Sequence, residues 1–174
     1  MDGLADTFDA FLSRKNKEEM LEIMRDSHIG VMGVLGLISI ILLKIAFLSS
    51  INIPSKIVPL FLMCILSRWS LALTMFSFPY ARKEGKAKVF IQGINLKIFI
   101  LSTIIAIVSV FAIYKIKGLL VFIIIVMSSY IIGKFINNKI GGITGDTLGA
   151  TNELTEVIIL FSVCILGRVN LWII

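Results

Sequence analysis

Long apolar runs alternate with short polar links along most of the chain. Five of these runs are long enough to cross a bilayer as helices of about 20 residues, and they extend over Gly30–Ser49, Ile57–Phe78, Leu96–Ile116, Leu119–Ile136 and Val157–Ile174. The pattern therefore predicts an all-α protein, a polytopic helical membrane protein with about five transmembrane helices. We expect residues 1–174 to form a single integral-membrane domain.

Three polar segments lie between or before these runs. Residues 1–29 are rich in charge, and their apolar side chains at 20, 21, 23 and 24 fall on one side of a helix that we expect to lie on the membrane surface. Segments 79–95 and 137–156 are predicted to be loops. Successive links alternate between the two sides of the membrane, so all three polar segments share one side.

Composition and charge agree with this topology. Hydrophobic residues make up 57% of the chain and the mean hydropathy is +0.98, well beyond an ordinary soluble domain. The net charge of +6 does not point to nucleic acid, because the basic residues lie in short links without interleaved aromatic residues. Most basic residues lie in the three polar segments, which the positive-inside rule places in the cytoplasm. We therefore expect an inner-membrane protein in contact with the lipid bilayer.

The first polar segment carries three regularly spaced carboxylates. Asp2, Asp6 and Asp9 are separated by four and three residues, so a helix turning about 100° per residue places them on one face. Clustered carboxylates repel one another unless a cation lies among them. Hard divalent ions such as Mg²⁺ choose oxygen ligands and often share them with a substrate phosphate. The spacing therefore favours a cation site at the start of the chain.

A glycine-rich segment, GGITGDTLGATNELTE, occupies residues 141–156 before the last span. Glycines adopt positive φ easily and allow backbone N–H groups at a helix start to approach phosphate. Asp146 and Glu153 share one helical face, and Gly149 and Ala150 leave room between them for a ligand or another helix. A flexible loop followed by a capped helix explains the same residues, and the pattern alone does not separate the two interpretations.

Two arginines and one histidine are further candidates. Arg68 lies near the middle of the second span, where an unpaired charge costs about 2.5 to 3.5 kcal/mol, so we expect either an anionic ligand or a structural ion pair beside it. Arg82 has a planar fork suited to phosphate. His28 is the only histidine, which argues against a zinc site, and we expect it to make a hydrogen bond at the membrane interface.

Four segments resemble the cobalamin synthase family, the adenosylcobinamide-GDP ribazoletransferases. They are DGLADTFDAF at 2–11, LEIMRDSHIG at 21–30, FPYAR at 78–82 and the glycine-rich segment at 141–156. The resemblance implies an Mg²⁺-dependent membrane enzyme that joins adenosylcobinamide-GDP to α-ribazole, or its 5′-phosphate, and releases GMP. Family members ordinarily have further spans before DGLADT, so the resemblance also implies that this chain lacks N-terminal spans.

The resemblance assigns roles to matching positions. Candidates for Mg²⁺ and diphosphate handling, and hence for catalysis, are Asp2, Asp6, Asp9 and Asp26, with Asp146 as a further catalytic candidate. Candidates for substrate binding are Gly142, Thr144, Gly145, Asn152 and Glu153, to which the charges of Arg68 and Arg82 add two more. The acidic motif is also similar to that of the CDP-alcohol phosphotransferases, but its spacing differs, so no roles are transferred from them.

Two other functions are compatible with the sequence. A membrane transporter or ion-binding module would use charged residues near the bilayer midplane, where we place only Arg68. An inactive truncated synthase would bind nucleotide without turnover. The sequence leaves the formation of a homo-oligomer open.

Overall fold

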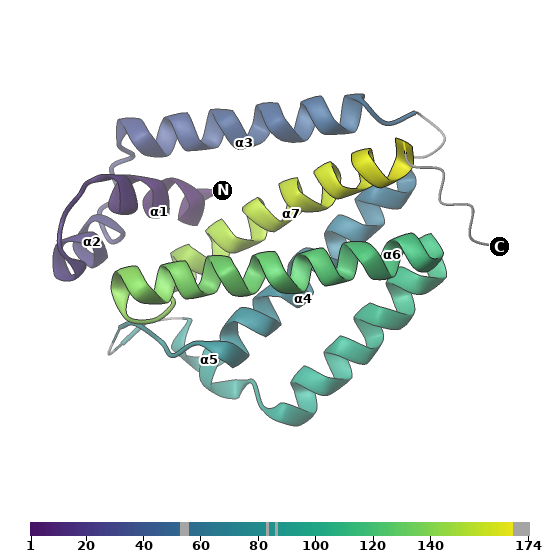
Figure 1. Cartoon of the computed structure of the whole chain (residues 1–174). Coiled ribbons are helices and arrows are strands. Elements are labelled where there is room, and N and C mark those ends of the chain that lie inside the picture. The colour runs from purple at the N-terminus through teal and green to yellow at the C-terminus, as the bar shows by residue number, and fades with distance from the viewer. Residues whose placement is uncertain (53–55, 83, 86, 169–174) are drawn as a thin grey trace.

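The computed structural model describes residues 1–52, 56–82, 84–85 and 87–168. Over these residues the protein consists of helices joined by short links, which confirms the all-α prediction (Figure 1). The helices are α1 (Asp2–Leu12), α2 (Lys17–Ile23), α3 (Val31–Ser49), α4 (Ile57–Ser77), α5 (Lys88–Gly93), α6 (Leu96–Ile140) and α7 (Gly145–Arg168).

Helices α3, α4, α6 and α7 are long and apolar enough to cross a membrane. The 45 residues of α6 would extend for about 68 Å, more than twice the thickness of a bilayer core. Helix α6 instead breaks at Lys115, where φ is 51° and ψ is −137°, and folds back as two arms (Figure 1). A Cβ on Gly118 would lie 2.2 Å from the carbonyl oxygen of Val110, so glycine permits this reversal. The arms correspond to two predicted spans, with the break slightly before the predicted link.

Helix α4 lies at the centre of the bundle and packs mainly against α6 and α7. The Trp69 indole N–H donates to Thr103 Oγ1 at 3.0 Å, which satisfies the polar atom of a buried ring. The buried core of these helices includes Leu62, Leu66, Trp69, Val110, Ile125 and Ile159. The outer faces of α3 and α6 expose many large apolar side chains. Such a surface fits lipid rather than water.

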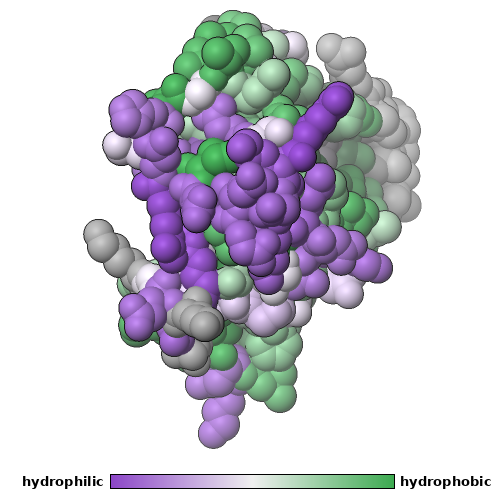
Figure 2. Space-filling view, turned by 90° about the vertical axis from the view of Figure 1, so that its left-hand side faces the viewer, coloured by the Kyte–Doolittle hydropathy of each residue, from purple (hydrophilic) through white to green (hydrophobic). Residues whose placement is uncertain are grey.

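The polar elements gather at one end of the bundle. Helices α1, α2 and α5 lie at the left of Figure 1, and Figure 2 looks onto this largely hydrophilic end. Helix α2 forms in the segment predicted to lie on the membrane surface, and it starts with a capping box between Asn16 and Glu19. Met20 and Met24 pack into the protein core, and the contact with the membrane stays a prediction. The predicted loops are shorter than expected, because α5 forms within 79–95 and α6 and α7 leave only 141–144 between them. The predicted end of the last span, 169–174, lies outside the described residues.

Two backbone hydrogen bonds join the links before α5 and α7. Ala81 N–H donates to Ile143 O at 2.9 Å, and Ile143 N–H donates to Pro79 O at 2.8 Å. Gly142 has a φ of 155°, and a Cβ there would lie 2.5 Å from Pro79 O. The predicted positive φ of the glycine-rich segment is confirmed. This conformation lets the link before α7 approach the segment 79–81 closely.

We expect Gly142→Ala to destabilise the protein by about 1–3 kcal/mol, because the side chain would strain the backbone and collide with Pro79. The measurement is the thermal unfolding midpoint in detergent. Gly93→Ala is the matched control, since a Cβ at Gly93 has no neighbour within 4 Å. Equal midpoints for the two variants would contradict the structural role of Gly142.

Candidate functional site

Helix α1 lies against the starts of α3 and α7. A Cβ on Gly3 would be 2.6 Å from the carbonyl oxygen of Asp146, and a Cβ on Gly149 would be 3.6 Å from the Cα of Gly3. Two glycines therefore allow the helices to approach closely. The open face that the sequence predicts at Gly149 and Ala150 is occupied by another helix, and this contact brings the acidic residues of α1 to Asp146.

The carboxylates of α1 and α7 influence one another. The pKa of Asp6 is raised from 3.8 to about 6, chiefly by burial and then by the charges of Asp2, Asp146 and Asp9, while Arg82 acts in the opposite direction. These groups lie close enough to disfavour full ionisation of the cluster. The structure therefore brings together Asp2, Asp6 and Asp146, which are far apart in the sequence, in a site with excess negative charge.

Arg82 links this acidic cluster to the segment 78–82. Its Nη2 lies 3.0 Å from Asp146 Oδ2. Its Nε is buried and has no hydrogen-bond partner among the described residues. An arginine with one nitrogen paired and another unpaired can still bind an oxyanion. Because the unpaired Nε is buried, only the exposed part of the guanidinium is open to an anion, and phosphate binding by Arg82 stays a prediction.

Asp9 has a different local role from Asp2 and Asp6. Its carboxylate accepts hydrogen bonds from Gly30 N–H at 2.7 Å and Gly33 N–H at 2.8 Å. A Cβ on either glycine would lie 2.4 Å from an Asp9 oxygen, so both positions need glycine for this contact. A carboxylate at this point satisfies backbone donors at the start of α3. Asp9 therefore anchors α1 to the first span.

Asp26 is paired with His28. The His28 Nδ1 lies 2.6 Å from Asp26 Oδ1, and the His28 backbone N–H donates to the same oxygen. These hydrogen bonds lower the pKa of Asp26. Both side chains are exposed. The predicted hydrogen bond of His28 is confirmed, and its position at the membrane interface stays a prediction. The structure gives Asp26 a local partner rather than a contact with the acidic cluster.

The threonines of the glycine-rich segment stabilise the start of α7. Thr144 N–H donates to Thr147 Oγ1 at 2.8 Å, and Thr147 N–H donates to Thr144 Oγ1 at 3.2 Å. Both side chains are buried, so these reciprocal bonds satisfy donors that a helix start leaves unpaired. Gly145 is the first residue of α7 and is exposed. Thr144 thus fixes the first turn of α7, which carries Asp146.

A second polar cluster lies deeper in the bundle. Lys44 Nζ is 2.5 Å from Glu153 Oε2 and 2.6 Å from Glu156 Oε2. Asn152 donates to Glu156 at 2.8 Å and accepts a hydrogen bond from Arg68. The partner of Arg68 is therefore an amide. Lys44 is not among the residues predicted from the sequence, although a lysine inside an apolar span indicates a buried anion opposite it.

Positive groups surround the two carboxylates of this deep cluster: Lys44 pairs with both, the Met1 ammonium lies 3.5 Å from Glu153 Oε1, and Arg68 contacts the adjoining Asn152. Arg68, Asn152 and Glu153 lie within it, about two helical turns along α7 from Asp146. Arg68 and Asn152 contact each other rather than Asp2 or Asp6, whereas Glu153 also lies 3.5 Å from the Met1 ammonium, next to Asp2. Their contacts fit a role in holding α3, α4 and α7 together.

The acidic cluster fits a divalent cation only in part. Among the described residues, no three His, Cys, Asp or Glu side chains are arranged as a ready metal site. Mg²⁺ usually keeps several waters and takes one or two carboxylates together with substrate phosphates. The mutual repulsion around Asp6 fits such an ion. Magnesium binding stays a prediction, in which one or two of the carboxylates of Asp2, Asp6 and Asp146 would hold the ion.

Comparisons with known proteins agree with the resemblance. A family described as Cobalamin-5-phosphate synthase matches residues 1–164. The chain is similar to three proteins named adenosylcobinamide-GDP ribazoletransferase. The protein from Thermoanaerobacter pseudethanolicus is 42% identical over 90% of this chain and 64% of its own length. The protein from Clostridium botulinum is 39% identical over 90% of this chain and 64% of its own length. The protein from Desulforamulus reducens is 33% identical over 96% of this chain and 67% of its own length.

The chain spans about two thirds of the length of the curated relatives that it matches. No solved structure matches it.

We expect Asp6→Asn to stabilise the metal-free protein at pH 7.5 by about 1 kcal/mol after allowance for solvent screening. The folded-state pKa of about 6 lies above the ordinary 3.8, so the folded state holds the proton more tightly. The ionised carboxylate therefore destabilises the protein fully above pH 6, and its effect disappears as the pH falls to about 4. Thermal unfolding with EDTA between pH 4 and pH 8 measures this dependence.

Asp9→Asn is the matched control for this prediction. It should destabilise the protein at neutral pH, because Asp9 accepts two backbone hydrogen bonds that a neutral amide satisfies less well. Asp6→Asn and Asp9→Asn should thus shift the unfolding midpoint in opposite directions. A loss of stability in Asp6→Asn at pH 7.5 would show that the ionised Asp6 carboxylate does not destabilise the folded protein.

We expect Lys44→Met to reduce the unfolding free energy by about 3 kcal/mol, because Glu153 and Glu156 would lose their buried countercharge. Unfolding in mixed detergent micelles measures the change. Lys97→Met, at an exposed position near the start of α6, is the control and should cost much less. Similar losses in both variants would show that the deep cluster contributes no particular stability.

Proposed function

The chain belongs to the cobalamin-5-phosphate synthase family, and on that premise we propose that it joins adenosylcobinamide-GDP to α-ribazole, or to its 5′-phosphate, with release of GMP. One observation carries this proposal. Three separate sequence motifs contribute charged residues to the polar end of the bundle: the first supplies Asp2 and Asp6, the second Arg82 and the third Asp146. Carboxylates beside an arginine suit a diphosphate bound together with a divalent ion.

In the proposed reaction, a hydroxyl oxygen of the ribazole attacks the phosphorus that carries the cobinamide arm. A P–O bond to the ribazole forms, the P–O bond to GMP breaks, and the hydroxyl proton is released. Phosphoryl transfer of this kind depends mainly on positioning and on neutralising charge. Mg²⁺ at the carboxylates would supply that neutralisation when bound.

The residues of the chain would position the diphosphate. Arg82 pairs through Nη2 with Asp146 and keeps part of its side chain exposed, so the exposed part of the guanidinium can donate to a phosphate oxygen. The reciprocal bonds of Thr144 and Thr147 fix the start of α7, and the bonds between Ala81 and Ile143 fix the segment that carries Arg82. Charge placement in the site is therefore set before substrate binds.

We also propose that the polar end faces the cytoplasm from the inner membrane. Its links contain most of the basic residues of the chain, as the positive-inside rule requires. The nucleotide and ribazole substrates are strongly polar, so a site at this end is open to them without passage through lipid.

We expect Asp146→Asn to reduce turnover by about 100-fold or more, because it removes a charge from the proposed diphosphate site. GMP release from adenosylcobinamide-GDP and α-ribazole 5′-phosphate, with the chain in liposomes and Mg²⁺, measures this. Glu22→Gln is the control, since Glu22 is exposed on α2 and should keep full activity. Uptake of a substrate into the liposomes without GMP release would instead favour a transporter.

A further inference from the structure

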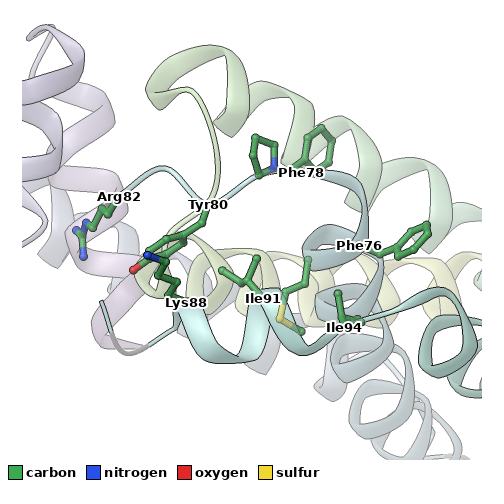
Figure 3. Close-up of a pocket in the computed structure, with 9 residues that line it drawn as sticks. Phe76, Phe78, Tyr80, Arg82, Lys88, Ile91 and Ile94 are labelled. Carbon is green, nitrogen blue, oxygen red and sulfur yellow. The ribbon is translucent and has the colours of Figure 1, made fainter. Parts of the chain in front are cut away.

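A cavity of about 730 Å³ opens between the end of α4, the segment 78–82 and α5 (Figure 3). Its volume lies within the range of pockets that hold small molecules. Arg82 lines the cavity and also pairs with Asp146. The cavity therefore adjoins the acidic cluster, and a group bound in it would lie beside the proposed site of phosphoryl transfer.

The lining has an apolar end and a basic end. Figure 3 shows Phe76 and Phe78 toward one end, and Tyr80, Lys88 and Arg82 toward the other. Aromatic rings stack on flat bases, and arginine or lysine binds phosphate. The arrangement suits an aromatic base attached to a phosphate-bearing sugar.

Two groups in the proposed reaction have this general form, the guanosine of the donor and the ribazole acceptor. Guanine carries an amide, a carbonyl and an amine, and burying them without partners is costly. Among the nine described residues that line the cavity, only Tyr80, Arg82 and Lys88 have polar side chains. The benzimidazole of ribazole has no exocyclic polar group, so it fits the apolar end better.

We propose, on the basis of the function proposed above, that this cavity binds the ribazole acceptor. The base lies against the ring of Tyr80 and extends toward the apolar end of the cavity, where Phe76 is stacked on Phe99 and Phe78 packs on Tyr130. The ribose or its 5′-phosphate lies toward Arg82 and Lys88. This orientation directs the sugar toward the acidic cluster, where its hydroxyl oxygen can reach the diphosphate.

The walls of the cavity are held in place by the surrounding chain. Tyr80 forms the bridge with Ile143, and a Cβ on Gly85 would lie 2.0 Å from the Tyr80 hydroxyl. The Phe78 ring lies 5.6 Å from the ring of Tyr130 and against Gly133, where a Cβ would come within 2.4 Å. A preformed wall loses little freedom when a ligand binds, which favours recognition of a small, rigid base.

Tyr80→Leu and Tyr80→Phe are a matched pair that tests this assignment. Removing the ring should weaken the binding of α-ribazole 5′-phosphate about tenfold, whereas Tyr80→Phe keeps the stacking surface and should bind within about twofold of the parent chain. Calorimetry with the whole chain in phosphatidylcholine nanodiscs, without adenosylcobinamide-GDP, measures binding independently of turnover. GDP should bind both variants equally.

The outcomes separate this assignment from the proposed function. Unchanged ribazole phosphate binding in Tyr80→Leu, or a loss of GDP binding instead, would overturn the ribazole site while GMP release continued to support the reaction. Tyr80-dependent binding in a chain that releases no GMP would support the ribazole site and contradict the reaction. Loss of ribazole phosphate binding when phosphatidylglycerol is added to the nanodiscs would show that the cavity takes a lipid headgroup, and would overturn the assignment.

Discussion

The pair of backbone hydrogen bonds between Ile143 and the 79–81 segment is the constraint on which the polar end depends. It joins the link that follows α4 to the link that precedes α7. On one side of this junction Arg82 reaches Asp146, and on the other Tyr80 and Phe78 form the wall of the cavity. Buried backbone groups need hydrogen-bond partners. These two bonds supply partners in both links, and they also fix Arg82 beside Asp146 and the wall of the cavity.

The acidic cluster exists because glycines let helices approach more closely than side chains would allow. Gly3 permits contact between α1 and α7, and Gly30 and Gly33 admit the carboxylate of Asp9 to the start of α3. This close fit buries Asp6 and brings it near other carboxylates, and both effects raise its pKa, burial the more strongly. Asp9 therefore stabilises a helix arrangement in which the ionised form of Asp6 is unfavourable. Strongly shifted pKa values of this kind are frequent at functional sites.

Much of this architecture could be predicted from periodicity and composition, because apolar runs of about 20 residues have few alternatives to a membrane-spanning helix. Helical spacing also placed Asp2, Asp6 and Asp9 on one face. Spacing could not show that Asp9 would accept hydrogen bonds from backbone N–H groups at the start of α3, since that contact depends on how α1 and α3 cross. The pairing of Lys44 with Glu153 and the cavity beside Arg82 likewise arise from tertiary contacts between distant segments.

Helix α7 shows how the site at the polar end and the deep cluster can depend on each other. Asp146 lies in its first turn, whereas Glu153 and Glu156 hold Lys44 about two to three turns deeper. Because a helix is stiff over this length, the deep ion pairs fix the rotation and depth of the same element that carries Asp146. A charge that is expensive to bury is tolerated where it specifies one arrangement of helices. The deep cluster therefore orients the helix that carries Asp146.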